Sequence, residues 1–206
     1  MKRITRIVLA LILLFVGLGR AKAVSTYTFE DVALNTSTPF SVTENGVTAS
    51  FSSPADPGAF TITTSFWAPP ISGNVLFDPG PSGASSIPLN VSFSQPLASI
   101  SMDFATDGSG PFNLSAFLGS TFVGTATAAG IIPPGFGFPQ GNISFGTATF
   151  DKVVLSSPNT PFFAVDNINV TPIPEPSSLA LISIAATLAS YFGWRRRKKA
   201  LAFFEG

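Results

Sequence analysis

The chain has 206 residues and no histidine or cysteine, which excludes disulfides, thiolate and imidazole metal sites, and Ser-His-Asp or Cys-His catalysis. Its formal net charge of zero hides a segregation, because ten of the eleven basic residues lie in 1–23 and 195–199. Residues 24–171 carry one lysine against nine acids, a net charge of −8 that excludes nucleic acid as a partner, since little there would neutralise phosphates.

The first 23 residues are organised as a signal peptide. A basic start is followed by an apolar run of 13 residues, namely Lys2, Arg3 and Arg6, then Ile7–Gly19. Ala21 and Ala23 flank Lys22 in the small-x-small pattern that signal peptidase recognises. The apolar run is short for a membrane span. We therefore expect cleavage after Ala23 and export of the remaining chain.

Residues 24–171 have the pattern of an all-β domain. Apolar and polar side chains alternate in Val47–Phe51, Phe60–Thr64 and Ile87–Phe93, and the alternation continues through Ile100, Met102 and Phe104. The other predicted strands are Leu114–Phe117, Thr121–Ala126, Ile143–Phe145, Phe150–Leu155 and Phe162–Val170, with a hairpin turn at Leu118–Ser120. Glycine and proline stand at nearly every junction, and no helical period is visible. The sequence predicts one jelly-roll β-sandwich over residues 24–171.

Two stretches are predicted loops, Pro54–Gly58 and Ala128–Gly141. The second carries Phe136 and Phe138 among glycines and prolines, and Trp67 precedes another proline-rich stretch. Exposed rings of this kind stack on sugars and would bind polysaccharide. The alternative is that Phe136 and Phe138 fold back as a lid on the open end of the sandwich.

Asp103 and Asp107 are the one close pair of carboxylates with a predicted position at the edge of a loop. Two such acids flanking a substrate support glycoside hydrolysis when their separation is right. Nothing in the sequence fixes that separation, and solvated surface acids are the commoner case. We therefore expect that the protein is not an enzyme.

The last 35 residues, 172–206, are organised as a membrane-directed tail. A linker, 172–176, ends in Pro174, Glu175 and Pro176, and 18 uncharged residues, 177–194, follow it. A helix of that length spans roughly 27 Å, close to the hydrocarbon core of a bilayer. Five cations come next, namely Arg195, Arg196, Arg197, Lys198 and Lys199. By the positive-inside rule they keep 195–206 in the cytoplasm, which predicts a transmembrane helix at 177–194 in the inner membrane.

A Pro-Glu-Pro tripeptide before a terminal apolar segment and a basic cluster, behind a leader, resembles the PEP-CTERM sorting signal of Gram-negative bacteria. The resemblance implies processing by the membrane protease exosortase and an association with biofilm and exopolysaccharide. It also implies a membrane-anchored precursor that is later released to the cell surface or the medium. Residues 200–206 depart from the pattern, because such signals commonly stop near the basic run.

Two further stretches, Tyr27–Val32 and Phe163–Val170, resemble the first and last strands of galactose-binding-like jelly rolls. In carbohydrate-binding members of that superfold, acids on these strands often hold a structural calcium, and Glu30 and Asp166 match the positions. Calcium needs six to eight oxygens, so backbone carbonyls and Asn167 or Asp31 would have to contribute. The alternative is that Asp166 and Asn167 cap a turn or face solvent.

Three classes of function remain open. The first is a non-catalytic protein of the cell envelope or extracellular matrix, delivered by its tail. The second is a carbohydrate-binding module with a structural calcium, and the third is a carboxylate-dependent glycoside hydrolase. The tail indicates where the protein is delivered and does not indicate a catalytic activity, which favours the first class.

Overall fold

The computed structural model describes residues 23–78, 87–158, 162–173 and 187–188. The segment Lys22–Ile173 is a compact unit by itself. The predicted signal peptide apart from Ala23, the Pro-Glu-Pro tripeptide, the basic cluster and the predicted membrane segment apart from Thr187 and Leu188 lie outside the described residues. Among the residues described, no helix has the length and hydrophobicity required to cross a membrane.

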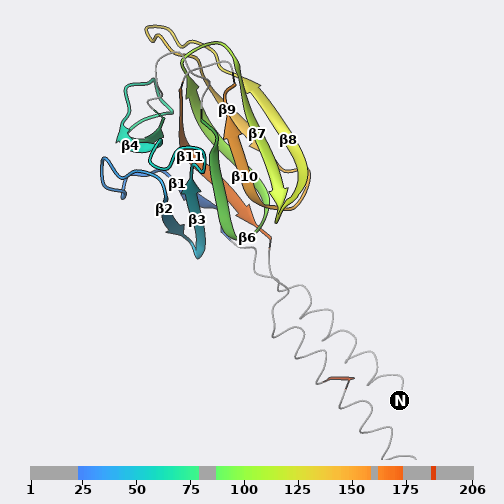
Figure 1. Ribbon diagram of the computed structural model, residues 1–206. Coiled ribbons are helices and arrows are strands. Elements are labelled where there is room, and N and C mark those ends of the chain that lie inside the picture. The colour runs from blue at the N-terminus through green and yellow to red at the C-terminus, as the bar shows by residue number, and fades with distance from the viewer. Residues whose placement is uncertain (1–22, 79–86, 159–161, 174–186, 189–206) are drawn as a thin grey trace, which may run out of the picture. The chain divides into compact units, whose positions relative to one another are not determined.

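The described part of the compact unit is built from strands, as Figure 1 shows. Their bounds are β1 Ser25–Tyr27, β2 Phe40–Glu44, β3 Val47–Ser52, β4 Thr61–Thr64, β5 Asn74–Phe77, β6 Leu89–Thr106, β7 Pro111–Leu118, β8 Thr121–Ala129, β9 Gln140–Phe145, β10 Phe150–Ser156 and β11 Phe163–Pro172. Buried and less buried residues alternate along most of them, as expected for strands with one face on a core.

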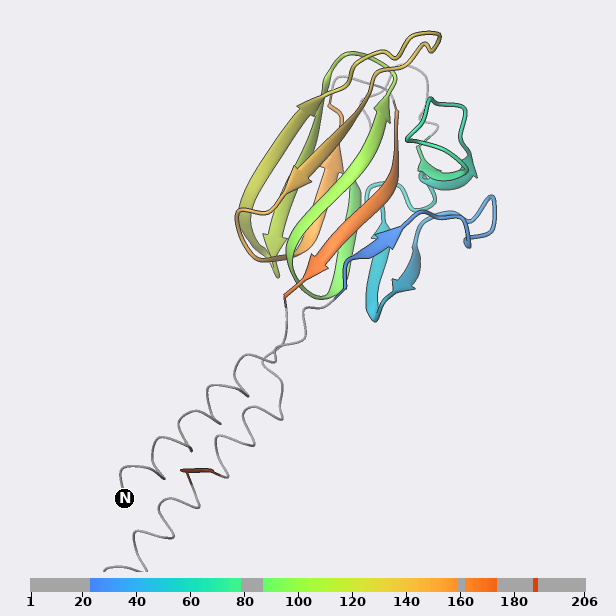
Figure 2. The same cartoon turned by 180° about the vertical axis from the view of Figure 1, so that it is seen from behind.

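The strands form two antiparallel layers that share β6 (Figures 1 and 2). In the first layer, the beginning of β6 pairs with β3 and β10, and the layer continues through β2 on one side and through β7 and β8 on the other. In the second layer, the end of β6 pairs with β11 and β9, and β11 also pairs with β1 and β5. β4 completes this layer by pairing with β5. Because β6 runs through both layers, it closes one side of the sandwich.

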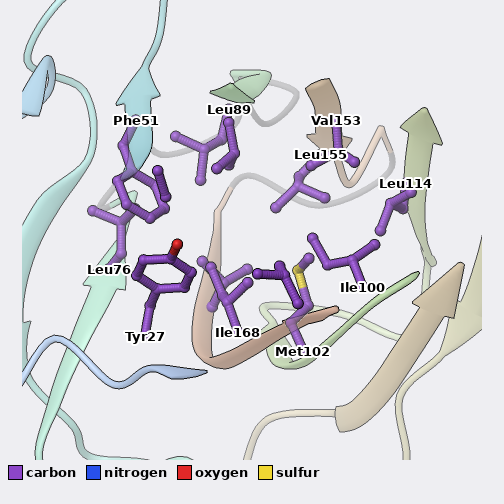
Figure 3. Packing of buried hydrophobic residues seen from close by; sticks show 14 of the residues in the cluster. Tyr27, Phe51, Leu76, Leu89, Ile100, Met102, Leu114, Val153, Leu155 and Ile168 are labelled. Carbon is purple, nitrogen blue, oxygen red and sulfur yellow. The ribbon is translucent and has the colours of Figure 1, made fainter. Parts of the chain in front are cut away.

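The hydrophobic core lies between the layers, and Figure 3 shows part of it. Phe112 of β7 stacks on Phe104 of β6 with ring centroids 4.4 Å apart, and it meets Phe163 of β11 edge-on at 5.2 Å. All three rings are fully buried. Phe112 belongs to the first layer and its two partners to the second, so these contacts join the layers. Each pair adds about 0.5–1.5 kcal/mol beyond its burial.

The predicted all-β sandwich of jelly-roll type is confirmed, since strands distant in sequence interleave within both layers. Details of the strand prediction are wrong. The sequence predicts separate strands at Ile87–Phe93 and Ile100–Phe104. Leu89–Phe93 and Ile100–Phe104 both belong to β6, because Pro96 lies where this strand passes between layers and not in a turn. The predicted first strand, Tyr27–Val32, ends at Tyr27, because Phe29 adopts φ 61° and accepts a hydrogen bond from the N–H of Val32.

Candidate functional site

A row of polar side chains crosses the outer face of the second layer. The register places Asp166 of β11 opposite Asp103 of β6, and Asp103 opposite Asn142 of β9. Both carboxylate oxygens of Asp103 accept hydrogen bonds from amides, one from Asn142 Nδ2 at 2.9 Å and one from Asn167 Nδ2 at 3.0 Å. Asp103 therefore accepts hydrogen bonds from two side-chain amides, whereas the facing Asp166 accepts from backbone N–H groups.

Asp166 is the buried member of this row, with 1% of its surface exposed. Its Oδ1 accepts a hydrogen bond from the N–H of Asn167 at 2.7 Å, and its Oδ2 accepts one from the N–H of Ser72 at 3.3 Å. Burial raises the pKa of Asp166 to about 6; the two N–H bonds lower it, and the charges of Glu30 and Asp103 raise it further. A buried carboxyl with a raised pKa is a costly charge, and it is the kind of group that marks a site.

Glu30 binds the same short segment as Asp166, from the turn that follows β1. Its Oε1 accepts a hydrogen bond from the N–H of Asn74 at 3.1 Å, two residues beyond Ser72. Gly73 lies between these two contacts with φ 67°, and a Cβ there would overlap the carboxylate of Glu30. Glu30 and Asp166 therefore both bind backbone N–H groups of Ser72–Asn74. The charge of Glu30 contributes to the raised pKa of Asp166.

The groups around Glu30 and Asp166 are oxygens, which are the ligands of calcium. The carbonyl oxygens of Phe29 and Val32 both point at the Asn74 side chain, whose Nδ2 donates to them at 3.4 and 3.3 Å. Within the described ranges no three acidic side chains surround a common point, so a calcium ion would depend on such carbonyls in addition to the two carboxylates. The contacts are also compatible with the alternative, in which Asp166 and Asn167 cap a turn, because Asp166 accepts the N–H of Asn167.

No basic side chain of the described compact unit neutralises these acids. Lys152 is the one basic residue of 24–171, and it belongs to β10 in the other layer. Its Nζ lies 4.7 Å from the centre of the Phe117 ring. The acids of the row are therefore compensated by N–H and amide donors alone, among the groups that the structure describes.

Aromatic side chains form a second cluster on the outer face of this layer. Trp67, for which the sequence suggests sugar stacking, is only 6% exposed, and Phe66 covers it with ring centroids 3.9 Å apart. Phe138 is partly buried and meets Phe66 edge-on at 5.9 Å. Phe136 is 41% exposed. Of the three predicted ligand residues, Phe136 is thus the one with a well exposed side chain.

Phe66, which the sequence pattern does not single out, presents the accessible ring of this cluster. It is 53% exposed. Phe66 and Trp67 follow the end of β4, and Trp67 lies at a bend, so the alternation of a strand does not apply to this pair. The sequence therefore gives no signal of which ring is buried.

Asp103 and Asp107 lie in different surroundings. Asp103 lies within β6 and not at a loop edge, whereas Asp107 follows the end of that strand. Four residues of extended chain separate their backbones by about 13 Å. The acid nearest in register to Asp103 is Asp166, which is buried.

Several solved structures resemble this chain at low sequence identity. The K1 cleaved adhesin domain of Lys-gingipain from Porphyromonas gingivalis W83 is 9% identical, with TM-score 0.46, over 73% of this chain and 99% of that one. A family 11 carbohydrate-binding module from Clostridium thermocellum is 17% identical, with TM-score 0.37, over 74% and 97%. The catalytic domain of a GH87 alpha-1,3-glucanase is 9% identical, with TM-score 0.38, over 75% of this chain and 28% of that one.

No curated protein matches the sequence. One family match falls on the tail, in the part that contains Pro174, Glu175 and Pro176. It begins at Pro172, the last residue of β11, and extends into the basic cluster. Residues 172–198 of this chain match the PEP-CTERM protein-sorting motif.

Proposed function

We propose that this chain is an exported, non-catalytic protein of the cell envelope or extracellular matrix, whose tail is processed by an exosortase-type membrane protease. The observation that supports this proposal is the position of the sorting motif. It starts where β11 ends, so that removal of the tail beyond Pro172 leaves every described strand in place. In this proposal signal peptidase acts after Ala23, and the mature sandwich reaches the cell surface or the medium, where it associates with exopolysaccharide in a biofilm.

Mass spectrometry of the mature protein, from cells with and without the protease, tests the processing step. We expect a C-terminus upstream of Arg195 when the protease is present and an intact tail when it is absent. A variant with Pro174, Glu175 and Pro176 all changed to Ala should keep its tail in both strains. An intact tail in both strains for the unaltered protein would contradict the proposal and leave an ordinary membrane anchor.

The absence of catalysis is proposed on the chemistry of the available groups. Histidine and cysteine do not occur in the chain. Among the acids, Asp166 is buried, and both oxygens of Asp103 are engaged by amides. A general acid or base must reach the proton that it transfers, and these two carboxylates are not placed to do so.

A second proposal is that the sandwich binds a neutral polysaccharide, and the exposure of Phe66 favours it. Loss of one stacking ring costs about 0.5–1.5 kcal/mol, so Phe66→Ala and Phe136→Ala should each weaken retention on the polysaccharide about two- to tenfold. Affinity electrophoresis over a panel of neutral glucans provides the measurement. Phe122→Ala is the matched control, since Phe122 is 57% exposed but belongs to β8 in the other layer. Equal retention of all variants, or an equal loss with the control, would argue against this site.

We also propose a structural calcium held by Glu30 and Asp166. The oxygen donors around Ser72–Asn74 and the lack of a basic neighbour among the described groups support it. When bound, the ion would supply the positive charge that these two acids lack. It would fix the turn after β1 against the first half of β11, and so it would act on stability and not on chemistry.

A further inference from the structure

Strand β8 is an open edge of the first layer. Thr121–Ala129 pair with β7, and the strand order of the path ends there. No described strand forms a ladder with its outer edge, although Ile131, two residues beyond β8, bridges Gln140 of β9, and Phe145 of β9 lies against Gly124. β8 lies at one margin of the sandwich in Figures 1 and 2. An open edge exposes unpaired backbone N–H and C=O groups, and these bind any strand brought alongside.

This edge lacks most of the features by which proteins protect such strands. β2, at the opposite margin of the same layer, has five residues and carries Glu44. β8 has nine residues without a charge or a proline. One register shift, next to Ala116 of β7, marks a bulge, and beyond it Gly124–Ala129 remain in regular register. A long, uncharged and mostly regular edge is a pairing surface.

The segment that contains β8 is uncharged and carries exposed apolar side chains; the charges next to it are Asp151, which accepts the N–H of Gly119, and Lys152, which lies over Phe117. Residues 108–150, which contain β7, β8 and β9, include no acidic or basic residue. Nine large hydrophobic side chains are exposed among the described residues, and five of them lie in this stretch, namely Leu118, Phe122, Ile131, Ile132 and Phe136. The nine acids of the exported part lie outside it.

We propose that two copies of this chain associate by antiparallel pairing of their β8 edges. An antiparallel edge is complementary to itself about a two-fold axis, so a second copy satisfies the same backbone groups on both chains. Each copy carries a net charge of −8 over residues 24–171, and electrostatic repulsion is lowest where the uncharged segments meet. The pairing extends the first layer across both copies. It does not depend on processing of the tail.

Sedimentation velocity of residues 24–173 over a range of concentrations tests the proposal. This fragment contains all the described strands and both hydrophobic clusters, and it corresponds to the compact unit. We expect a concentration-dependent dimer for the unaltered fragment. Thr125→Lys places a charge at the middle of the edge, and it should weaken the dimer at least about 100-fold, because like charges across such an interface cost several kcal/mol.

Thr43→Lys is the matched control on β2. Both threonines are exposed, and each gives up one side-chain hydrogen bond, Thr125 to the carbonyl of Leu114 at 2.9 Å and Thr43 with Thr48 at 2.8 Å. We expect this control to dimerise as the unaltered fragment does. A monomer at all concentrations, or equal weakening by both substitutions, would overturn the proposal.

Cysteine crosslinking gives a second readout that does not rely on a disruptive change. The chain has no cysteine of its own, so any disulfide must come from the introduced residue. Thr125→Cys or Thr127→Cys should yield a disulfide-linked dimer under mild oxidation, whereas Thr43→Cys should remain monomeric. Crosslinking at Thr43 alone, or at none of the three positions, would overturn pairing through β8.

Discussion

Lowering the pH from 7 to 4 in metal-free buffer is expected to stabilise the wild-type protein, relative to an Asp166→Asn variant, by on the order of 2–3 kcal/mol in the free energy of unfolding. Burial, together with the charges of Glu30 and Asp103, raises the pKa of Asp166 in the folded chain to about 6. The folded protein therefore binds this proton more tightly than the unfolded chain does. The resulting stability is fully present below about pH 4, and it is lost as the pH rises through about 6.

Denaturant unfolding at several pH values, with a chelator present, provides the measurement. The test compares how the difference in unfolding free energy between wild type and Asp166→Asn changes with pH. The absolute stability of the variant is not informative, because its amide accepts one N–H bond fewer than the carboxylate does. Asp56→Asn is the control for the loss of one negative charge, since Asp56 lies exposed in the loop before β4. A difference between wild type and Asp166→Asn that does not change with pH would contradict the assignment of Asp166 as a costly buried charge.

Calcium at about 100 times its dissociation constant is expected to stabilise the wild-type protein by about 2.7 kcal/mol, which raises Tm by about 5–10 °C. The reason is that the ion replaces the missing positive charge between Glu30 and Asp166. Glu30→Gln and Asp166→Asn should each lose this rise, and Asp56→Asn should retain it. Magnesium should stabilise less, because it requires a smaller octahedral shell and holds its waters more firmly.

Thermal unfolding in calcium and in chelator, followed by circular dichroism, provides this measurement. An equal Tm for the wild type in both buffers would contradict the calcium proposal. So would a calcium response that survives both Glu30→Gln and Asp166→Asn. The pH effect of Asp166 is measured without metal, so it stands or fails separately from calcium binding.

The fold class was predictable because it follows from a local pattern. In β3, the residues Val47, Ala49 and Phe51 alternate with polar neighbours and are all fully buried. In strands of this type, the alternation of apolar and polar residues identifies the buried face from the sequence. β5 does not, because Val75 and Leu76 are adjacent and both buried, one in each of the two hydrophobic clusters. A strand that is covered on both faces has no alternation to find.

The candidate site was predictable only in part. The resemblance to jelly rolls points to Glu30 and Asp166, and the structure brings both to Ser72–Asn74. The contribution of that segment has no signal in the sequence, since its backbone N–H groups make the contacts. The sequence also does not predict that Trp67 is buried beneath Phe66, because both residues are aromatic and only their packing in the fold distinguishes them.

Local patterns were enough to establish the all-β class, the position of the PEP-CTERM motif and the segregation of charge, because each depends on residues that are close together along the chain. Folding in three dimensions was needed to show which acids meet, which rings remain accessible and which strand edge stays open. Those features depend on pairing between strands far apart in sequence, such as β6 with β11 and β9. A one-residue change in such a register would move every side chain of a strand to the other face, and local patterns do not fix it at the polar rows.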